Sequence, residues 1–186
     1  MSKLLAASRI CLRAVAAALV IVQSAAASAT GLEVEVLTDF QEPWAMAFLP
    51  DGRMLVTEKQ GRLLLVNADG KTHEAVLGVP EVDYGGQGGL GDVALHPAFA
   101  DNGFVYISYA EAGKGDTRGA AVARGVLDTS VAPPRLTRLE VIWRQYPKML
   151  GRGHYGHRIL FDASGHLWIS SGERQKFTPS QDMQSN

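Results

Sequence analysis

The residues best suited to chemistry flank a predicted β-hairpin near the end of the sequence. Two short β-prone runs, Ile159–Phe161 and Leu167–Ser170, are separated by Asp162-Ala163-Ser164-Gly165, which is typical of a turn. The segment before the first run is Gly153–Arg158, with two histidines and an arginine, and the segment after the second run is Ser171–Arg174. The hairpin would bring these two polar segments together at its open end.

An imidazole and a carboxylate are expected to face each other across this hairpin. If its loop is formed by the two central residues of the turn, or by all four, His154 lies opposite Glu173. A carboxylate beside an imidazole fixes the tautomer and increases the basicity of the ring, as a general base at neutral pH requires. A slip of one residue would move Glu173 to the other face of the hairpin. The alternative is that His154 is a histidine at the edge of the fold and has an acidic neighbour only by chance.

Other kinds of site fit the sequence less well. Residues three apart on a strand point to opposite faces, so His154 and His157 are poorly placed to bind one metal ion. We therefore predict no metal ligands here. Beyond residue 30 there is no cysteine, and no Gly-x-Ser-x-Gly segment is present. Arg158 lies on the face of His154, where it either holds an anionic group by paired hydrogen bonds or is a structural arginine that pairs across the hairpin.

Three copies of one pattern predict repeated β-units. A glycine, any residue, three apolar residues and a Ser or Thr recur at Gly52–Thr57, Gly103–Ser108 and Gly165–Ser170. Each copy follows an apolar strand that ends in a turn, and no convincing helical period is present. The other expected strands include Trp44–Leu49, Leu63–Val66, Val93–Leu95, Ala121–Leu127 and Leu139–Trp143. Repeated four-stranded units predict an all-β fold, a β-propeller. A β-sandwich with three similar hairpins is the alternative.

Polar residues recur at the start of the first strand of each unit, namely Gln41, Gln87 and His154. The first strand of each propeller blade lines the central channel, so these residues are expected to converge at one mouth and bind a small polar ligand. Gln87 lies in Tyr84–Gly91, where five of eight residues are glycine, so a flat ligand can approach the backbone closely. A plain inter-blade loop is the alternative. A phosphate loop is disfavoured because neither Gly-Lys-Ser/Thr nor a helix follows.

The N-terminal 29 residues have the layout of a secretory signal peptide. Lys3, Arg9 and Arg13 precede an apolar run and the small residues Ala27-Ser28-Ala29, after which cleavage is expected. The apolar run is too short for a comfortable membrane span. Cys11 is the only cysteine and lies inside this segment, so the mature protein uses no disulfide. These features predict a periplasmic or secreted protein.

The sequence after the signal peptide is mildly acidic. Residues 1–30 hold three of the 18 Lys and Arg residues and none of the 19 Asp and Glu residues, which leaves a net charge of −4 for the remainder. No basic run of the kind that follows a nucleic-acid backbone is present. We therefore expect no nucleic-acid partner and no membrane span after signal cleavage.

Residues in all three units resemble one known family. They are Pro43-Trp44-Ala45-Met46-Ala47-Phe48-Leu49-Pro50-Asp51-Gly52, then Gly86-Gln87-Gly88-Gly89-Leu90 with His96-Pro97-Ala98-Phe99, then His154-Tyr155-Gly156-His157-Arg158 with Gly172-Glu173. The sequence resembles the soluble, pyrroloquinoline quinone (PQQ)-dependent aldose sugar dehydrogenases, also grouped as glucose/sorbosone dehydrogenases. The resemblance covers nearly all of the sequence after the signal peptide.

The resemblance implies a fold, a reaction and roles for four residues. The family fold is a six-bladed β-propeller, with PQQ and Ca²⁺ near the axial mouth. The histidine matched by His154 accepts a proton from the anomeric hydroxyl of an aldose while hydride passes to the quinone and a lactone forms. The carboxylate matched by Glu173 supports this histidine. Gln87 matches a glutamine at the reaction centre and Arg158 matches an arginine of the same motif, so both are expected to contact substrate or cofactor. An electron acceptor then completes the cycle.

Two departures from the family refine this expectation. The glucose dehydrogenase branch has an aspartate where Gly153 stands, which favours the broader aldose branch. Six blades at the observed spacing of 51 and 62 residues need roughly 300 residues or more. Residues 30–186 are thus expected to form the N-terminal portion of the dehydrogenase domain, about three blades of an incomplete propeller that is inactive alone. The calcium ligands and main PQQ contacts are expected after residue 186.

Two functions of other classes are weighed against the dehydrogenase. One is a non-catalytic β-propeller that binds a sugar or a protein partner. The other is a propeller hydrolase of the lactonase kind, which needs several carboxylate or asparagine metal ligands around the axis. The glutamines and the histidine at the strand starts count against the hydrolase.

Overall fold

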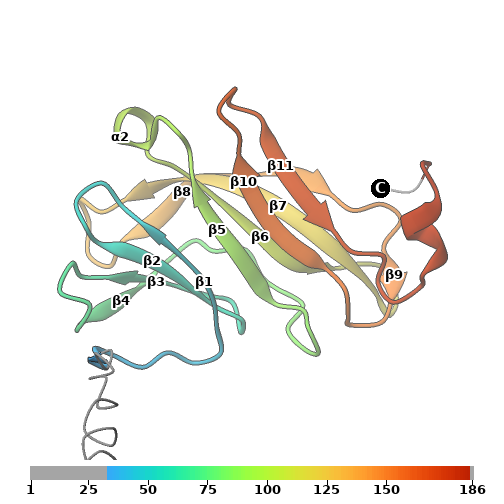
Figure 1. Cartoon of the computed structure of the whole chain (residues 1–186), viewed down its shortest axis with the longest axis horizontal. Helices are drawn as coiled ribbons and strands as arrows, with labels where there is room; N and C mark the ends of the chain where they lie inside the picture. Colours follow the sequence, from blue (N-terminus) through green and yellow to red (C-terminus); the bar gives the residue numbers. More distant parts are fainter. Residues whose placement is uncertain (1–32, 185–186) are drawn as a thin grey trace, which may run out of the picture. The chain divides into compact units, whose positions relative to one another are not determined.

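The computed structural model describes residues 33–184. The predicted signal peptide, residues 1–29 with Cys11, lies outside the described residues. Within residues 33–184 nearly all regular structure is β-strand, and Figure 1 shows successive antiparallel sheets. In this part of the chain no helix has the length and apolar character needed to cross a membrane.

The first sheet consists of four strands joined by consecutive hairpins. In spatial order they are β1 (Pro43–Phe48), β2 (Met54–Glu58), β3 (Arg62–Val66) and β4 (His73–Val76). Gly52 has a φ of +87° in the turn between β1 and β2, a conformation that accounts for the glycine at the start of this repeat copy. The middle strands β2 and β3 are almost wholly buried, and their side chains alternate between two apolar clusters, one on each face of the sheet.

The second sheet is larger and is connected to the first along its outer edge. In order its strands are β5 (Leu90–Leu95), β6 (Phe104–Ala112), β7 (Thr117–Asp128) and β8 (Arg135–Arg144), with β9 (Met149–Leu150) also paired to β7. A short helix, α2 (Phe99–Asn102), precedes β6. After β4, the Leu77 N–H donates to the Pro134 carbonyl at 2.8 Å and the Leu77 carbonyl accepts the Leu136 N–H at 2.7 Å.

The third unit is the predicted hairpin near the end of the chain. It is formed by β10 (Gly156–Phe161) and β11 (Leu167–Ser171), and a short 3₁₀ helix, η1 (Thr178–Gln181), follows. The strands expected from the sequence are all present. The elements that were not predicted are α2, β4, β9 and η1, whose two to four residues are too few to give a periodic signal.

Two apolar cores join the three sheets. The larger core lies between the first and second sheets, and its fully buried residues include Leu55, Leu63, Leu90, Val105 and Ile107. A smaller core joins the second sheet to the hairpin and includes Tyr106, Val122 and Ile159. The first strands of the three units, β1, β5 and β10, consequently lie side by side (Figure 1), as expected for strands that line a channel.

A threonine hydroxyl joins the first sheet to the second. Thr57, the last residue of the first repeat copy, is fully buried. Its Oγ1 accepts the Ala45 N–H of β1 at 3.0 Å and donates to the Gly91 carbonyl of β5 at 2.7 Å. One side chain therefore satisfies backbone groups on two different sheets.

A serine makes the same connection between the second sheet and the hairpin. Ser108 Oγ accepts the Asp92 N–H of β5 at 2.9 Å and donates to the His157 carbonyl of β10 at 2.6 Å. In the third repeat copy, Ser170 Oγ accepts the Arg158 N–H of β10 at 3.0 Å. In each copy the terminal Ser or Thr thus accepts an N–H of the first strand of its own unit. In the first two copies it also donates to the next unit, and we call this connection the hydroxyl bridge.

The hydroxyl bridges lie where the strand pairing is irregular. Register shifts occur in β1 between Pro43 and Ala45, in β5 between Leu90 and Val93, and in β10 between Gly156 and Ile159. A bulge of this kind removes a residue from the hydrogen-bond ladder and leaves its N–H without a backbone acceptor. The hydroxyl at the end of each repeat copy supplies the missing acceptor.

Two apolar sheet faces remain exposed. Trp44, Met46 and Phe48 alternate along β1 with 43–64% exposure, and Leu160 and Trp168 on the hairpin are 49% and 61% exposed. The predicted fold class is confirmed, because the described chain consists of successive antiparallel units with adjacent first strands and open outer faces, as in an incomplete β-propeller.

Replacing Ser108 tests the hydroxyl bridge. Ser108→Ala leaves the Asp92 N–H and the His157 carbonyl buried without this partner, so the free energy of unfolding should fall by about 1–3 kcal/mol. Ser130→Ala is the control, since Ser130 is exposed and bonds only within its own turn. Urea unfolding of the purified variants measures both values. Equal stabilities of the two variants would show that the bridge contributes nothing.

Candidate active site

His154 lies in the connection between β9 and β10 rather than on a strand. Its φ of +50° is unusual for a non-glycine residue and is fixed by contacts on both sides. The His154 N–H donates to Gln87 Oε1 at 2.7 Å, and the His154 carbonyl accepts the Arg174 N–H at 3.3 Å. The backbone of His154 is therefore held on both sides, while its side chain remains 44% exposed to solvent.

His154 and Glu173 are in direct contact. Nδ1 of the imidazole lies within hydrogen-bond distance of Oε1 of the carboxylate. An ionised carboxylate only accepts hydrogen bonds, so the ring is the Nδ1–H tautomer and its lone pair is on Nε2. The arrangement presents Nε2 as the basic atom of the pair.

The expected register of the hairpin was wrong by one residue, although the expected pair is present. Because Phe161 pairs with Leu167, five residues form the loop rather than two or four. Continued unchanged, this register would place Tyr155 opposite Glu173. The bulge near the start of β10 shifts the pairing back by one residue, and His154 therefore meets Glu173. The loop length and the bulge, neither of them predicted, compensate for each other.

Glu173 is held in its ionised form. The hydrogen bond with His154 is the main cause that lowers the pKa of Glu173 below its usual value. Its second oxygen accepts the backbone N–H groups of Lys176 and Phe177, which also lower the pKa. The carboxylate is thus charged at neutral pH and fixed on both oxygens.

Gln87 lies against the backbone of His154. Its own N–H donates to the Arg152 carbonyl at 2.7 Å, while its Oε1 accepts the His154 N–H. The side-chain amide is exposed, and with Oε1 engaged its Nε2 remains as a donor toward solvent. The structure therefore brings Gln87, His154 and Glu173 into one cluster.

The glycines around Gln87 pack against the protein itself. A Cβ at Gly88 would lie 2.8 Å from the Tyr155 ring, and a Cβ at Gly91 would lie 2.6 Å from Cγ of His157. The expectation that a flat ligand approaches the backbone is wrong at these two positions, because two aromatic rings of the chain occupy the space. Glycine is required there for close packing between units.

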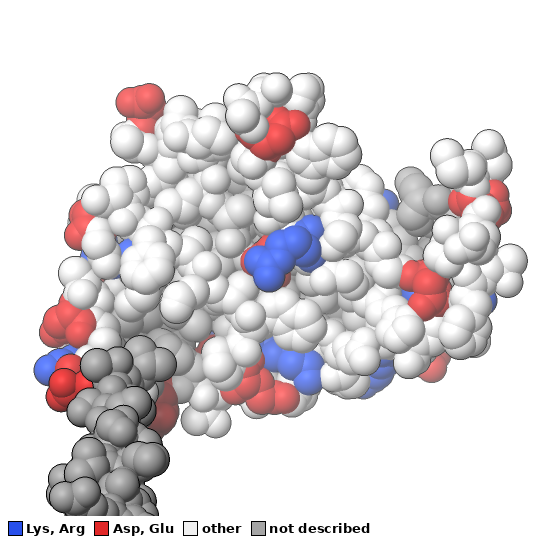
Figure 2. Space-filling view, in the orientation of Figure 1, with Lys and Arg blue, Asp and Glu red and all other residues white. Residues whose placement is uncertain are grey.

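Arg158 is paired with Asp92 of the second sheet. Its Nη1 lies 3.2 Å from both carboxylate oxygens, and Asp92 Oδ2 also accepts the Ile159 N–H at 2.9 Å. The alternative of a partner across the hairpin is wrong, since the partner is on β5. Asp92 is buried but the Arg158 side chain is 67% exposed. Figure 2 shows a basic side chain beside an acidic one over β5 and β10, within a largely uncharged face.

His157 is separated from His154 by its burial. Its ring is 2% exposed, stacks on Tyr155 at 5.1 Å and meets the edge of Trp44 at 5.7 Å. Neither of its ring nitrogens has a hydrogen-bond partner among the described residues. Burial, together with the nearby Arg174 guanidinium, lowers the pKa of His157 to about 4. His157 is therefore a neutral packing residue.

Other residues show where the sequence interpretation was incomplete. Gln41 does not join the cluster; its N–H donates to Glu58 Oε1 at 2.5 Å. A cavity of about 610 Å³ is lined by Glu173 but by none of the other predicted site residues. The sequence indicates no role for Asp92 or Arg174, although Asp92 orients Arg158 and Arg174 directly follows Glu173. No spacing signal in the sequence distinguishes them from surface charges.

Comparison with known proteins identifies the family. The sequence profile of the glucose/sorbosone dehydrogenases matches residues 40–186. The chain belongs to the glucose/sorbosone dehydrogenase family. This confirms the resemblance seen in the first, second and third units.

Among the relatives of this chain is the aldose sugar dehydrogenase YliI of Escherichia coli. The two are 40% identical over 160 residues, which is 85% of this chain and 42% of the relative. The quinoprotein glucose dehydrogenase B of Acinetobacter calcoaceticus is 37% identical over 76 residues, 39% of this chain and 16% of that protein.

Solved structures agree with these sequence matches. The apo form of the soluble aldose sugar dehydrogenase from Escherichia coli matches with a TM-score of 0.77 and 39% identity, covering 82% of this chain and 44% of that chain. The PQQ-bound aldose sugar dehydrogenase from Streptomyces coelicolor matches with a TM-score of 0.74 and 29% identity, covering 83% and 45%. This chain thus spans less than half the length of the relatives that match most of it.

The burial of His157 predicts acid-sensitive stability. The unfolded chain binds a proton to this imidazole near pH 6.5, whereas the folded protein does so only near pH 4. Between these values the unfolded state holds more protons, so stability falls as the pH decreases through this window, by on the order of 3 kcal/mol in total.

His157→Phe keeps a flat ring between Trp44 and Tyr155 but cannot be protonated. The loss of unfolding free energy from pH 7 to pH 4.5 should therefore be smaller in this variant than in the wild type. Denaturant unfolding at several pH values measures the difference. An identical pH dependence in the two proteins would assign the acid sensitivity to other groups.

Proposed function

We propose that this chain is the N-terminal portion of a periplasmic or secreted, PQQ-dependent sugar dehydrogenase that oxidises the anomeric hydroxyl of aldoses to lactones. The observation that carries the proposal is the contact between His154 Nδ1 and Glu173 Oε1, with Gln87 bonded to the His154 backbone. Membership of the family and the 40% identity to an aldose sugar dehydrogenase support it.

His154 acts as the general base. Glu173 accepts the Nδ1–H, so Nε2 faces the substrate with a free lone pair and removes the proton of the anomeric hydroxyl. The imidazolium that results is stabilised by the Glu173 carboxylate, whose lowered pKa keeps it ionised throughout. As the proton leaves O1, a hydride leaves C1, and the carbonyl of the lactone forms.

Gln87 and Arg158 hold ligand groups in this proposal. The Gln87 Nε2 is a donor close to the base and suits a sugar hydroxyl or a carbonyl oxygen. The Arg158 guanidinium is exposed, while Asp92 fixes it from the protein side. A guanidinium held in this way suits paired hydrogen bonds to a carboxylate.

These groups fit PQQ, which is a flat, anionic molecule rich in carbonyl and carboxylate oxygens. When bound, PQQ supplies the acceptor for the hydride that leaves the sugar. Arg158 would hold it by charge-assisted hydrogen bonds, and Gln87 by its amide N–H. No group of three acidic, histidine or cysteine side chains within residues 33–184 is placed to hold a metal ion. As the family resemblance implies, the Ca²⁺ ligands and the main PQQ contacts in this proposal lie after residue 186.

The substrate class and the remaining domains follow from the same reasoning. Gly153, where the glucose branch has an aspartate, favours a range of aldoses over glucose alone. The apolar faces on β1 and on the hairpin suit further blades of a six-bladed ring. An electron acceptor outside this chain would reoxidise the cofactor.

The competing function is a non-catalytic propeller that binds a sugar or protein. Measuring whether the full-length protein oxidises aldoses distinguishes the two functions.

Replacing the proposed base tests the mechanism. In the full-length protein with PQQ and Ca²⁺, His154→Ala should lower kcat for dye-linked aldose oxidation by about two to four orders of magnitude. His166→Ala is a matched control, because His166 Nδ1 also lies near a carboxylate oxygen, that of Asp162 at 3.2 Å, at the other end of the hairpin. The control should retain wild-type activity. Near-normal turnover in His154→Ala would refute its role as the base.

Expressing residues 30–186 alone tests whether the proposed active site also needs residues after 186. Exposed apolar faces of roughly several hundred Å² promote association. The chain alone should therefore self-associate and show no aldose oxidation with added PQQ and Ca²⁺, as size-exclusion chromatography and a dye assay would report. A monodisperse monomer with turnover would contradict both the blade count and the assignment of cofactor contacts to later residues.

A further inference from the structure

Arg174 is a buried arginine whose role the sequence does not indicate. Its side chain is 0% exposed, and its guanidinium lies 3.5 Å from the centroid of the Tyr155 ring. All three of its nitrogens donate to backbone carbonyls: Nε to Gly153 at 2.7 Å, Nη1 to Arg118 at 2.9 Å, and Nη2 to Gly151. A buried charge is costly, so this full set of partners indicates a constrained position.

These contacts link the two segments that carry the proposed catalytic pair. Arg174 follows Glu173 directly, and Gly153 precedes His154 directly. The side chain of Arg174 binds the Gly153 carbonyl, while its backbone N–H binds the His154 carbonyl at 3.3 Å. Two hydrogen bonds from one residue thus set the separation of the imidazole and the carboxylate.

The hydrogen bonds of Arg174 to Gly153 and His154 lie beyond the end of the regular strand pairing. The last residues paired in the strands of the hairpin are Gly156 and Ser171. Beyond them the two segments are joined by two backbone hydrogen bonds, from the Gly172 N–H to the Tyr155 carbonyl at 3.1 Å and from the Arg174 N–H to the His154 carbonyl at 3.3 Å. His154 and Arg174 also have positive φ values of +50° and +60°, which persist only where surrounding contacts determine them. Arg174 supplies such contacts for both segments.

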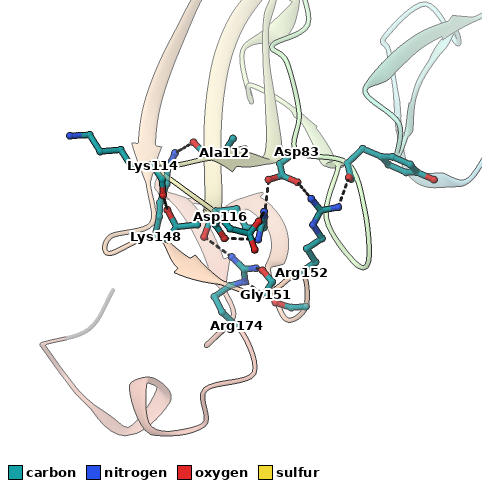
Figure 3. A network of polar contacts seen from close by, with 12 residues as sticks. Asp83, Ala112, Lys114, Asp116, Lys148, Gly151, Arg152 and Arg174 are labelled. Carbon is teal, nitrogen blue, oxygen red and sulfur yellow. Dashed lines mark hydrogen bonds and ion pairs between the residues drawn. The ribbon is translucent and has the colours of Figure 1, made fainter.

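The guanidinium also ties this region to the glycine-rich segment. Arg118, whose carbonyl binds Arg174, pairs with Asp83 at 2.8 Å, and Asp83 lies 3.6 Å from Arg152. The Arg152 carbonyl in turn accepts the N–H of Gln87. Figure 3 shows Arg174 and Gly151 close to Asp116, with Asp83 and Arg152 beside them. Gln87, His154 and Glu173 are therefore supported by one continuous network.

We infer that Arg174 is a positioning residue that holds His154 and Glu173 in register, an inference that rests on the proposed function. A lysine retains the charge but has a single nitrogen, which cannot reach all three carbonyls. Arg174→Lys should therefore loosen the pair without removing either member of it. Misplacement on this scale lowers kcat by about 10- to 100-fold and affects KM less.

The test uses the full-length protein and two kinds of measurement. Steady-state kinetics with PQQ, Ca²⁺ and an aldose gives kcat and KM for Arg174→Lys, and for Arg174→Gln should the lysine variant fail to fold. The effect on kcat should shrink when Glu173→Gln is already present, since both changes act through the orientation of His154. Arg124→Lys is the control, because Arg124 combines an ion pair to Glu140 with a contact to the Phe104 ring outside the site.

The second measurement needs neither cofactor nor activity. The pKa of Glu173, followed by NMR of its carboxyl carbon in the ligand-free protein, should rise toward the usual value in Arg174→Lys, since the His154 hydrogen bond is the main cause that lowers it. A merely structural arginine would leave this pKa unchanged. An unchanged pKa, or a loss of kcat that is additive with Glu173→Gln, would overturn the inference. If the wild type oxidises no aldose, the proposed function fails, and the pKa still decides whether Arg174 positions the pair.

Discussion

The structure depends on one repeated interaction, the hydrogen-bonded hydroxyl that joins each sheet to the next. Thr57 and Ser108 each accept an N–H from the bulged first strand of their own sheet and donate to a carbonyl on the first strand of the following sheet. Both hydroxyls are buried, where unpaired backbone groups would be strongly destabilising. The bridges therefore fix how the first strands lie beside one another.

The placement of the site follows from this constraint. The carbonyl that accepts the Ser108 hydroxyl belongs to His157, and the N–H that donates to the hydroxyl belongs to Asp92. Asp92 then orients Arg158, and the bulge in β10 shifts the pairing so that His154 meets Glu173. The same irregularity thus provides the contact between units and the geometry of the proposed catalytic pair.

Much of the fold was predictable because each unit repeats a short local pattern. Apolar runs after glycine turns indicated the strands, and their recurrence indicated a propeller. The hairpin loop and the bulge were not predictable in this way. A loop of five residues and one of four differ by a single turn residue, and the bulge depends on the Ser170 hydroxyl and the Asp92 carboxylate, which are distant in sequence or on another sheet.

The candidate site was predictable in part for the same reason. His154, Glu173 and Gln87 were recognised by residue type and position at the strand ends. The role of Arg174 depends on three carbonyls from segments up to 56 residues away, and no pattern in the sequence records such contacts. The expectation that a ligand approaches the backbone is wrong at Gly88 and Gly91, because the rings that fill the space there, Tyr155 and His157, come from another unit.

The most direct measurement of the central claim is the pH–rate profile of aldose oxidation by the Glu173→Gln variant of the full-length protein. Glutamine can still bind His154 Nδ1, but it removes the negative charge that stabilises the protonated imidazole. The account predicts a lower maximal turnover and an acid limb displaced to lower pH than in the wild type. A profile with unchanged height and position would contradict the assignment of His154 and Glu173 as the catalytic pair.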